Sequence, residues 1–331
     1  MATVASQVRQ SVPVVDIAAL AGPVTPAFRD TARSLRGVFE TIGFAYIAGH
    51  GVAQAQVDDV FAASRAFHAL PLEAKQRLKI NAAHRGYMGM STSTIVTSSV
   101  AKVTKPNQSE SLMVMHEVAP DDPDLLADKP LQGENQWPAA LPDFKPRVLA
   151  YNAALEAVAR RLTRALAVAF DLPETWFDPH FAKPTTWLRL LHYPPLPDPL
   201  PPDLFSSAPH TDYGFLTVLA QDDTGGLEVR GRDGSWIPAP PIKGTFVVNV
   251  ADILMQWTNG ILVSTPHRVR NVAGRDRYSV PFFFDPGIDS MVECLPGILP
   301  AGETPRWPAT SWRDYVMERL DKNYVYRQRS C

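Results

Sequence analysis

The stretch from Ala208 to Leu219 reads Ala-Pro-His-Thr-Asp-Tyr-Gly-Phe-Leu-Thr-Val-Leu and decides the fold prediction for the whole chain. Its second half is apolar and β-favouring, so we expect a strand that begins near Pro209, where a missing backbone N–H does least harm. Residues i and i+2 of a strand point to the same face. His210 and Asp212 are therefore expected to direct an imidazole and a carboxylate into one space, which is two thirds of a metal site.

A third metal ligand is expected from another strand, because three ligands on one face of an ion have to converge from separate elements. The segment from Ser264 to Val269 reads Ser-Thr-Pro-His-Arg-Val and supplies the candidate His267. Two histidines and one carboxylate on one face of an octahedron are typical of non-haem Fe(II) sites and leave three positions open. Taken singly, a histidine or aspartate near a strand end is more often a surface or capping residue. The prediction of a metal site therefore rests on the ordered combination of the three residues.

A carboxylate clamp is expected ten residues later. The segment from Arg277 to Phe284 reads Arg-Tyr-Ser-Val-Pro-Phe-Phe-Phe and favours a strand. The period of two places Arg277 and Ser279 on the same face. A guanidinium fork binds both oxygens of a carboxylate, and a hydroxyl beside it adds a further donor.

This ordered set of motifs resembles the isopenicillin N synthase-like branch of the iron(II)/2-oxoglutarate-dependent dioxygenases. The resemblance implies Fe(II) at His210, Asp212 and His267, with no catalytic side chain beyond these ligands. It implies 2-oxoglutarate with its distal carboxylate on Arg277 and Ser279, and O2 as the second cosubstrate. The implied activity is oxidation of a small organic molecule, most often hydroxylation, with succinate and CO2 as coproducts.

Further site residues are expected on the resemblance. The strand-like segment from Trp187 to Pro194 has a tyrosine before proline, which in relatives helps to hold a carboxylate, so Tyr193 is expected to bind the cosubstrate or the substrate. Many relatives place an asparagine two residues earlier, whereas this chain has Leu191. Strict alternation along the strand from Arg277 places Phe283 on the inner face, towards the substrate. A bulge at Pro281 would instead turn its two neighbouring phenylalanines inward.

One wall of the substrate pocket is expected between residues 84 and 118. Residues 91–99 are rich in serine and threonine and predict a loop. By resemblance, Met90, Ser111 and Met113 are candidates for substrate contact; a surface loop and a core strand are the alternative for each. No residue outside these sets singles out a substrate.

The expected fold class is α+β, mainly β, with a double-stranded β-helix (jelly roll) core. About eight short strands between 186 and 290 favour two packed antiparallel sheets. Residues 1–120 are expected to form an N-terminal α/β leader packed on the core of residues 121–331, as one integrated domain. Apolar periodicity predicts flanking helices at 26–41, 53–69, 142–169 and 312–324, the last docking outside the barrel or covering its mouth.

Composition limits the function classes. The 331 residues are 45% hydrophobic and 20% charged, with a net charge of -2, which provides no electrostatic argument for binding nucleic acid or an anionic membrane. Cys294 and Cys331 cannot form a disulfide framework. Residues 1–11 lack the pattern of a secretory signal and no long apolar run occurs, so a cytoplasmic location is the default expectation.

Two alternatives stay open. Isopenicillin N synthase itself uses iron and oxygen without a keto acid, and its Arg-x-Ser pair binds the carboxylate of the substrate. A jelly-roll binding protein that has lost catalysis is the second alternative, although intact ligands and an intact clamp argue against it. Nucleotide-dependent enzymes and Ser-His-Asp hydrolases lack support, because the chain has neither a glycine-rich phosphate motif nor a nucleophile elbow.

Overall fold

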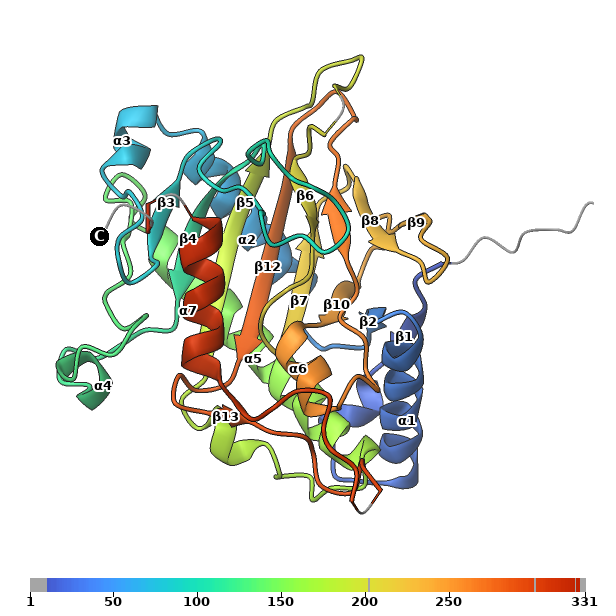
Figure 1. Ribbon diagram of the computed structural model, residues 1–331. Coiled ribbons are helices and arrows are strands. Elements are labelled where there is room, and N and C mark those ends of the chain that lie inside the picture. The colour runs from blue at the N-terminus through green and yellow to red at the C-terminus, as the bar shows by residue number, and fades with distance from the viewer. Residues whose placement is uncertain (1–10, 202, 301, 325, 328–331) are drawn as a thin grey trace, which may run out of the picture.

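The computed structural model describes residues 11–201, 203–300, 302–324 and 326–327, and Figure 1 shows two β-sheets with helices around them. Residues 1–10 and Cys331, which entered the expectations on secretion and disulfides, lie outside these ranges. The larger sheet has the strand order β1 (Val14–Asp16), β2 (Phe44–Ala48), β10 (Phe246–Val250), β7 (Leu216–Gln221), β12 (Arg277–Asp285), β5 (Thr185–Tyr193), β4 (Glu110–Met115) and β3 (Gly86–Met88). The smaller sheet has the order β6 (Ser207–His210), β11 (His267–Val269), β8 (Leu227–Arg230) and β9 (Trp236–Pro238).

The strands from β5 to β12 pass back and forth between the two sheets. In chain order, β5, β7, β10 and β12 belong to the larger sheet, whereas β6, β8, β9 and β11 belong to the smaller one. This alternation is the double-stranded β-helix, and the expected jelly roll is confirmed. A two-stranded sheet of β13 (Met291–Val292) and β14 (Thr310–Ser311) follows.

Helices surround this core. The longest helix, α5, lies against the larger sheet, as expected for the segment 142–169 (Figure 1). The α-helices are α1 (Pro26–Thr41), α2 (Gln54–His68), α3 (Leu72–Gln76), α4 (Pro123–Leu126), α5 (Phe144–Ala169), α6 (Asp252–Trp257) and α7 (Trp312–Asn323), with 3-10 turns at Ala18–Ala21 and Asp178–Phe181. None of the described helices is long and apolar enough to cross a membrane.

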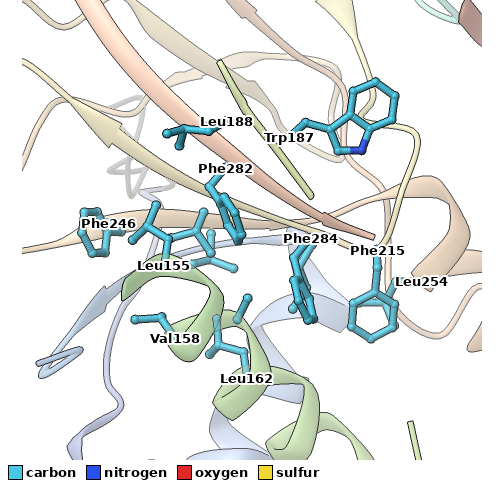
Figure 2. Close-up of a cluster of buried hydrophobic side chains, with 14 of the residues drawn as sticks. Leu155, Val158, Leu162, Trp187, Leu188, Phe215, Phe246, Leu254, Phe282 and Phe284 are labelled. Carbon is cyan, nitrogen blue, oxygen red and sulfur yellow. The ribbon is translucent and has the colours of Figure 1, made fainter. Parts of the chain in front are cut away.

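The core lies between α5 and the outer face of the larger sheet. Figure 2 shows Phe282 and Phe284 of β12 with side chains of α5, Leu155 and Leu162 among them. These four residues are at most 2% exposed, and burial of each such side chain stabilises the fold by about 1.5–3 kcal/mol. Because successive residues of a strand point to opposite faces, this packing directs the residues between them towards the other sheet.

The register of β12 shows no bulge. Pro281 pairs with Leu219 of β7, and the residues on either side continue the same pairing. Strict alternation therefore holds along the strand, and Phe283 shares its face with Arg277 and Ser279.

The N-terminal leader positions the segment that carries His267. Helix α1 begins at a Thr25 hydroxyl that accepts a hydrogen bond from the amide of Phe28 at 3.2 Å. After α1 the chain turns through Gly43 at φ +69°, where an added Cβ would lie 2.1 Å from the carbonyl oxygen of Val263. The adjacent Thr265 donates a hydrogen bond to the carbonyl of Ile42 at 2.7 Å. This close approach fixes the loop that leads into β11.

One expected strand is interrupted in the structure. The strand expected from Pro209 to Leu219 is interrupted: β6 ends at His210, and β7 begins only at Leu216. The backbone between them bonds to the start of α6 instead of a strand, since the amide of Asp252 donates to the carbonyl of Asp212 at 2.9 Å. Strand alternation is thus not what brings His210 and Asp212 together, and that part of the prediction is wrong.

Strand β10 ends at Val250, and the short helix α6 follows it. Sequence reasoning missed this helix, because six residues are too few to distinguish a helical from a strand period.

Candidate metal centre and two adjoining chambers

Three potential metal ligands meet where the two sheets face each other. His210 of β6 pairs with His267 of β11, so the two rings project from directly opposed positions. The Nε2 atom of each ring is 3.7 Å from Oδ1 of Asp212, which lies in the turn after β6. All three ligand atoms lie within 4.8 Å of one another. One divalent ion fits between them.

Backbone carbonyls orient both imidazole rings. Nδ1 of His210 is 2.7 Å from the carbonyl oxygen of Ala208, and Nδ1 of His267 is 3.3 Å from that of Thr265. Donation of the Nδ1 proton to a carbonyl leaves the Nε2 lone pair free for a metal. Both rings therefore present the correct nitrogen to the centre.

The carboxylate of Asp212 is held by one oxygen. Its Oδ2 accepts hydrogen bonds from the hydroxyl of Thr217 at 2.5 Å and from the amide nitrogen of Asn249 at 2.8 Å. Its Oδ1 is the atom that faces the two histidines. Asn249 comes from β10 and Thr217 from β7, so the larger sheet orients a ligand for a centre whose histidines belong to the smaller sheet.

The protonation states of His210 and Asp212 match metal binding. Burial, together with the neighbouring His267, lowers the pKa of His210 to about 4. Burial acts to raise the pKa of Asp212, but the two histidines and its hydrogen bonds lower it on balance. A neutral His210 and an ionised carboxylate at neutral pH are the forms that coordinate a divalent cation. The donor set is the facial triad typical of non-haem Fe(II).

Asp252, at the start of α6, connects the segments around the centre. Its carboxylate accepts hydrogen bonds from Thr211 at 3.2 Å, from Ser264 at 2.7 Å and from the hydroxyl of Tyr315 at 2.8 Å. These partners lie beside Asp212, in the loop before β11 and on α7. Burial raises the pKa of the Asp252 carboxyl. Asp252 therefore links three segments around the site, and it does not belong to the cluster of potential metal ligands.

A chamber on one side of the centre, which we name the clamp chamber, contains Arg277. The side chain of Arg277 is fully buried: Nε donates to the carbonyl of Gly225 at 2.5 Å and Nη2 to Gln221 at 3.1 Å. Its guanidinium carbon lies 4.8 Å from the ring centroid of Tyr193. Nη1 is buried and has no hydrogen-bond partner within the described ranges. An unpaired guanidinium N–H is a donor for an anionic ligand.

Ser279 and Tyr193 lie beside the guanidinium in the clamp chamber. The hydroxyl of Ser279 is 3.5 Å from the hydroxyl of Tyr193. The remaining wall includes the apolar side chains of Leu191, Leu219 and Val269 and also polar ones, Arg189 among them. An elongated anion therefore finds a charged partner at the Arg277 end and another at the metal end of the chamber.

A second chamber, the α7 chamber, lies on the other side of the centre. Aromatic rings of Trp187, Tyr213, Phe283 and Trp312 form much of its wall. Helix α7 closes it with one face, to which Trp312, Val316, Leu320 and Asn323 belong. The helix expected at 312–324 thus covers the mouth of the barrel. The cavity volume is about 90 Å³, against about 70 Å³ for the clamp chamber.

Polar atoms without partners are buried in the wall of the α7 chamber. Nε2 of His84, Nε1 of Trp312 and Oδ1 of Asn323 make no hydrogen bond within the part of the chain that the structure describes. Burial places the pKa of His84 well below its usual value, so the ring is neutral. Such atoms indicate that the chamber accommodates a ligand with polar groups.

The residues expected to contact the substrate lie at different depths. Met113 and Phe283 line the α7 chamber. Ser111 lies behind the wall, where its hydroxyl accepts a hydrogen bond from Nε of Arg189 at 2.9 Å. Met90 is 40% exposed and borders neither chamber.

Comparison with known proteins agrees with this geometry. The model of the 2OG-Fe(II) oxygenase superfamily matches residues 184–286, and that of the N-terminal region of non-haem dioxygenases in morphine synthesis matches residues 12–140. The 2-oxoglutarate-Fe(II) type oxidoreductase hxnY of Emericella nidulans is 33% identical over 94% of this chain and 90% of its own length. Homoarginine-6-hydroxylase 2-ODD-233 of Oryza sativa is 34% identical over 96% of this chain and 98% of its own.

The chain belongs to the 2OG-Fe(II) oxygenase superfamily. Among solved structures, a full-length Neurospora crassa protein in complex with alpha-KG and thymine superposes with a TM-score of 0.83, at 28% identity, covering 96% of this chain and 98% of that one. The oxygenase uses Fe(II) together with 2-oxoglutarate and O2, as expected from the motifs. The 2-oxoglutarate-dependent prediction is therefore confirmed over the keto-acid-independent alternative and the non-catalytic one.

Sequence reasoning did not single out several side chains that line the α7 chamber of this oxygenase. Arg189 and Trp187 share a face of β5 with Tyr193, so the period of two carried a signal for both. Asp285 likewise continues the inner face of β12. No sequence signal pointed to His84 or Asn323, because their positions depend on how a loop and α7 pack on the barrel.

Proposed function

We propose that His210, Asp212 and His267 bind Fe(II) in this oxygenase, and that the substrate is oxidised in the α7 chamber. The observation that supports this assignment is the position of the three ligand atoms, which form one cluster where the two chambers meet. Fe(II) with 2-oxoglutarate bound supplies the oxidising chemistry, and the keto acid leaves as succinate and CO2. Hydroxylation is the outcome that we propose.

We further propose that the clamp chamber holds 2-oxoglutarate. The unpaired Nη1 of Arg277 binds the distal carboxylate, and the hydroxyls of Ser279 and Tyr193 donate to it. The bonds from Arg277 to Gly225 and Gln221 fix the fork, so little conformational freedom is lost on binding. The apolar side chains around the middle of the cosubstrate exclude water from it.

The substrate that we propose is a small organic molecule, comparable in size with the cosubstrate. The cavity volumes of the two chambers are similar, at about 90 and 70 Å³. Solved relatives bind small molecules, as in the Neurospora crassa complex with alpha-KG and thymine. The net charge of -2 and the enclosing aromatic walls disfavour a nucleic acid or a membrane surface as the partner. Met113 and Phe283 contact the substrate, and α7 shields it from water. The composition supports a cytoplasmic location.

Formation of the iron–keto acid chelate tests the assignment. Metal-free protein is mixed with Fe(II) and 2-oxoglutarate without oxygen, and the visible charge-transfer band of a chelated keto acid is recorded. We expect the band in the wild type and its absence in His210→Ala. Iron binding without a band would contradict the role of the clamp chamber, and a full band in His210→Ala would contradict the ligand assignment.

A further inference from the structure

Arg189 lies in the middle of the barrel and has no anionic partner among the described residues. It lies on β5, and its side chain is half-buried. Its one hydrogen bond within the described ranges runs from Nε to the hydroxyl of Ser111, and no carboxylate there forms an ion pair with it. The Nη1 and Nη2 atoms of the guanidinium are therefore free to bind a ligand. An anion bound there gains a charge-assisted hydrogen bond in a partly desolvated site.

The position of Arg189 relates it to the metal centre. Arg189 belongs to the wall of both chambers, together with His210, Asp212 and Phe283. On the same face of β5, Trp187 lies towards the α7 chamber and Tyr193 towards the clamp chamber. A ligand in the α7 chamber that binds Arg189 therefore lies beside the metal ligands.

The charges that line the two chambers show which ligand Arg189 fits. The cations are Arg189 and Arg277, and the carboxylates are Asp212 and Asp285. Burial raises the pKa of Asp285 to about 8, so this side chain is mostly neutral at pH 7. The histidines that face the site from the described elements are His84 and the two candidate metal ligands. Burial places the pKa of His84 well below its usual value, and an imidazole coordinates a metal as the neutral ligand.

Loading the site with its cofactors leaves one positive charge. Fe(II) carries two positive charges, of which Asp212 balances one and the near carboxylate of 2-oxoglutarate the other. The distal carboxylate of 2-oxoglutarate balances Arg277. Arg189 alone then has no counter-charge among the side chains that line the chambers. A neutral substrate would leave this charge unbalanced, whereas a monoanionic one balances it.

We propose that the substrate carries a carboxylate, which the guanidinium of Arg189 binds in the α7 chamber. This inference rests on the proposed function and narrows its substrate class to small monocarboxylates with an apolar body. The aromatic rings of Trp187, Tyr213 and Phe283 pack against that body. Because Arg189 adjoins the metal ligands, the oxidised carbon lies near the carboxylate and not at the far end of the molecule.

One competing partner for Arg189 is the cosubstrate itself. Leu191 occupies the position where many relatives have an asparagine. Arg189 lies two residues before it, on the same face of β5. In this alternative, the guanidinium of Arg189 binds the near carboxylate of 2-oxoglutarate and not a carboxylate of the substrate. The charge balance disfavours this assignment, since that carboxylate is already balanced by the metal. Titration of the protein already loaded with 2-oxoglutarate distinguishes a substrate carboxylate from the cosubstrate as the partner of Arg189.

Matched probes test for a carboxylate site. Protein is loaded without oxygen with Fe(II) and saturating 2-oxoglutarate, then titrated with benzoate and benzamide, phenylacetate and phenylacetamide, and hexanoate and hexanamide. Tryptophan fluorescence reports binding, because Trp187 and Trp312 line the chamber. The chelate absorption band shows whether the cosubstrate stays bound. The variants are Arg189→Gln, which keeps a donor for Ser111 without the charge, and Arg189→Lys, with Arg33→Gln at the surface as control.

We expect at least one carboxylate to bind wild type about 10-fold or more tightly than its amide, as one buried charge pair of about 1.4 kcal/mol requires. The preference should vanish in Arg189→Gln, persist in part in Arg189→Lys and be unchanged in Arg33→Gln. Equal binding of the amides, a preference that survives in Arg189→Gln, or no carboxylate binding at all would overturn the inference. Loss of the chelate band on adding a carboxylate would also overturn the inference. The same holds if the sole effect of Arg189→Gln is weaker binding of 2-oxoglutarate. Absence of the band in wild type would instead refute the proposed function.

Discussion

His210 and His267 lie directly opposite each other on two antiparallel strands, β6 and β11, and their ring centroids are 4.3 Å apart. The pairing of the two strands therefore sets the separation of two metal ligands. Because each ring also donates to a carbonyl two residues before it in the chain, the ligands are oriented before any ion binds.

Removal of either histidine should abolish the iron site. We expect His267→Ala to lower Fe(II) affinity by about 100-fold or more. This exceeds the loss of affinity expected when a residue that only hydrogen-bonds to a metal ligand is removed. Equilibrium dialysis with Fe(II) under anaerobic conditions measures the affinity. His116→Ala, whose ring lies outside both chambers, serves as the control. Equal iron affinity in the two variants would exclude His267 as a ligand.

Asn249 should influence iron binding without touching the iron. Its amide nitrogen holds Oδ2 of Asp212, so Asn249→Ala removes one of the two hydrogen bonds that orient the carboxylate. We expect Fe(II) affinity to fall by about 10-fold or more, the range found for outer partners of metal ligands. The isosteric change Thr217→Val should act in the same direction. A thermal midpoint that drops while iron affinity stays constant would show a purely structural role for Asn249.

Arg277 should determine the affinity for 2-oxoglutarate. Arg277→Leu leaves the distal carboxylate without its charged partner, at a cost of about 2 kcal/mol or more, which corresponds to about 30-fold weaker binding. Titration of the chelate band with 2-oxoglutarate measures this affinity. Arg275→Leu is the matched control, because its side chain is 55% exposed and pairs with Asp223 at the surface. If both variants bind 2-oxoglutarate as tightly as the wild type, the clamp lies elsewhere.

Asp285 should make the metal-free protein less stable as the pH rises. Its pKa in the fold is raised to about 8, against about 3.9 for an unfolded aspartate, so between these values the folded state binds the extra proton. Stability from this group is fully present below about pH 4 and is lost towards pH 8, by up to about 1.4 kcal/mol per pH unit. Asp285→Asn keeps an acceptor for the amide of Phe215 and lacks this dependence. Urea unfolding at several pH values should show the variant gaining on the wild type as pH rises; parallel curves would contradict the assignment.

Two glycine-to-alanine substitutions should have opposite effects on the stability of the fold. A Cβ at Gly214 would lie 1.6 Å from Oδ1 of Asp285, so Gly214→Ala has to displace a buried side chain and should cost about 1–3 kcal/mol. A Cβ at Gly37, inside α1, meets no atom within 4 Å, and Gly37→Ala should stabilise the protein by up to about 1 kcal/mol. Urea midpoints of the two variants measure both effects. A neutral Gly214→Ala would show that the turn after β6 can shift freely.

The parts of the site that follow from local pattern were predictable. Helix α1 spans the residues that periodicity predicts, and the spacing of His210, Asp212 and His267 identified the residues that meet at the centre. The route by which they meet was not predictable. The turn at residues 211–215 depends on hydrogen bonds to α6, a helix too short to be recognised from sequence.

The walls of the α7 chamber were predictable only on the strands. Alternation from Tyr193 and from Arg277 places Trp187, Arg189 and Asp285 on inner faces. Asn323 reaches the chamber only because α7 packs across the barrel, and no local pattern states which surface a helix will cover. The charge balance that gives Arg189 its proposed role likewise requires knowing which side chains share one space.

The α7 chamber takes part of its wall from outside the segment that carries the metal ligands. The three candidate ligands and the Arg277 clamp all lie within residues 184–286, the segment that the superfamily model matches. The α7 roof lies after that segment, and the loop carrying His84 lies before it. Part of the selectivity is therefore encoded outside the segment that carries the reactivity. Substitutions in the roof and the loop can change which molecules this oxygenase accepts while leaving its means of using oxygen untouched, so a lineage can acquire new substrates without rebuilding the chemistry.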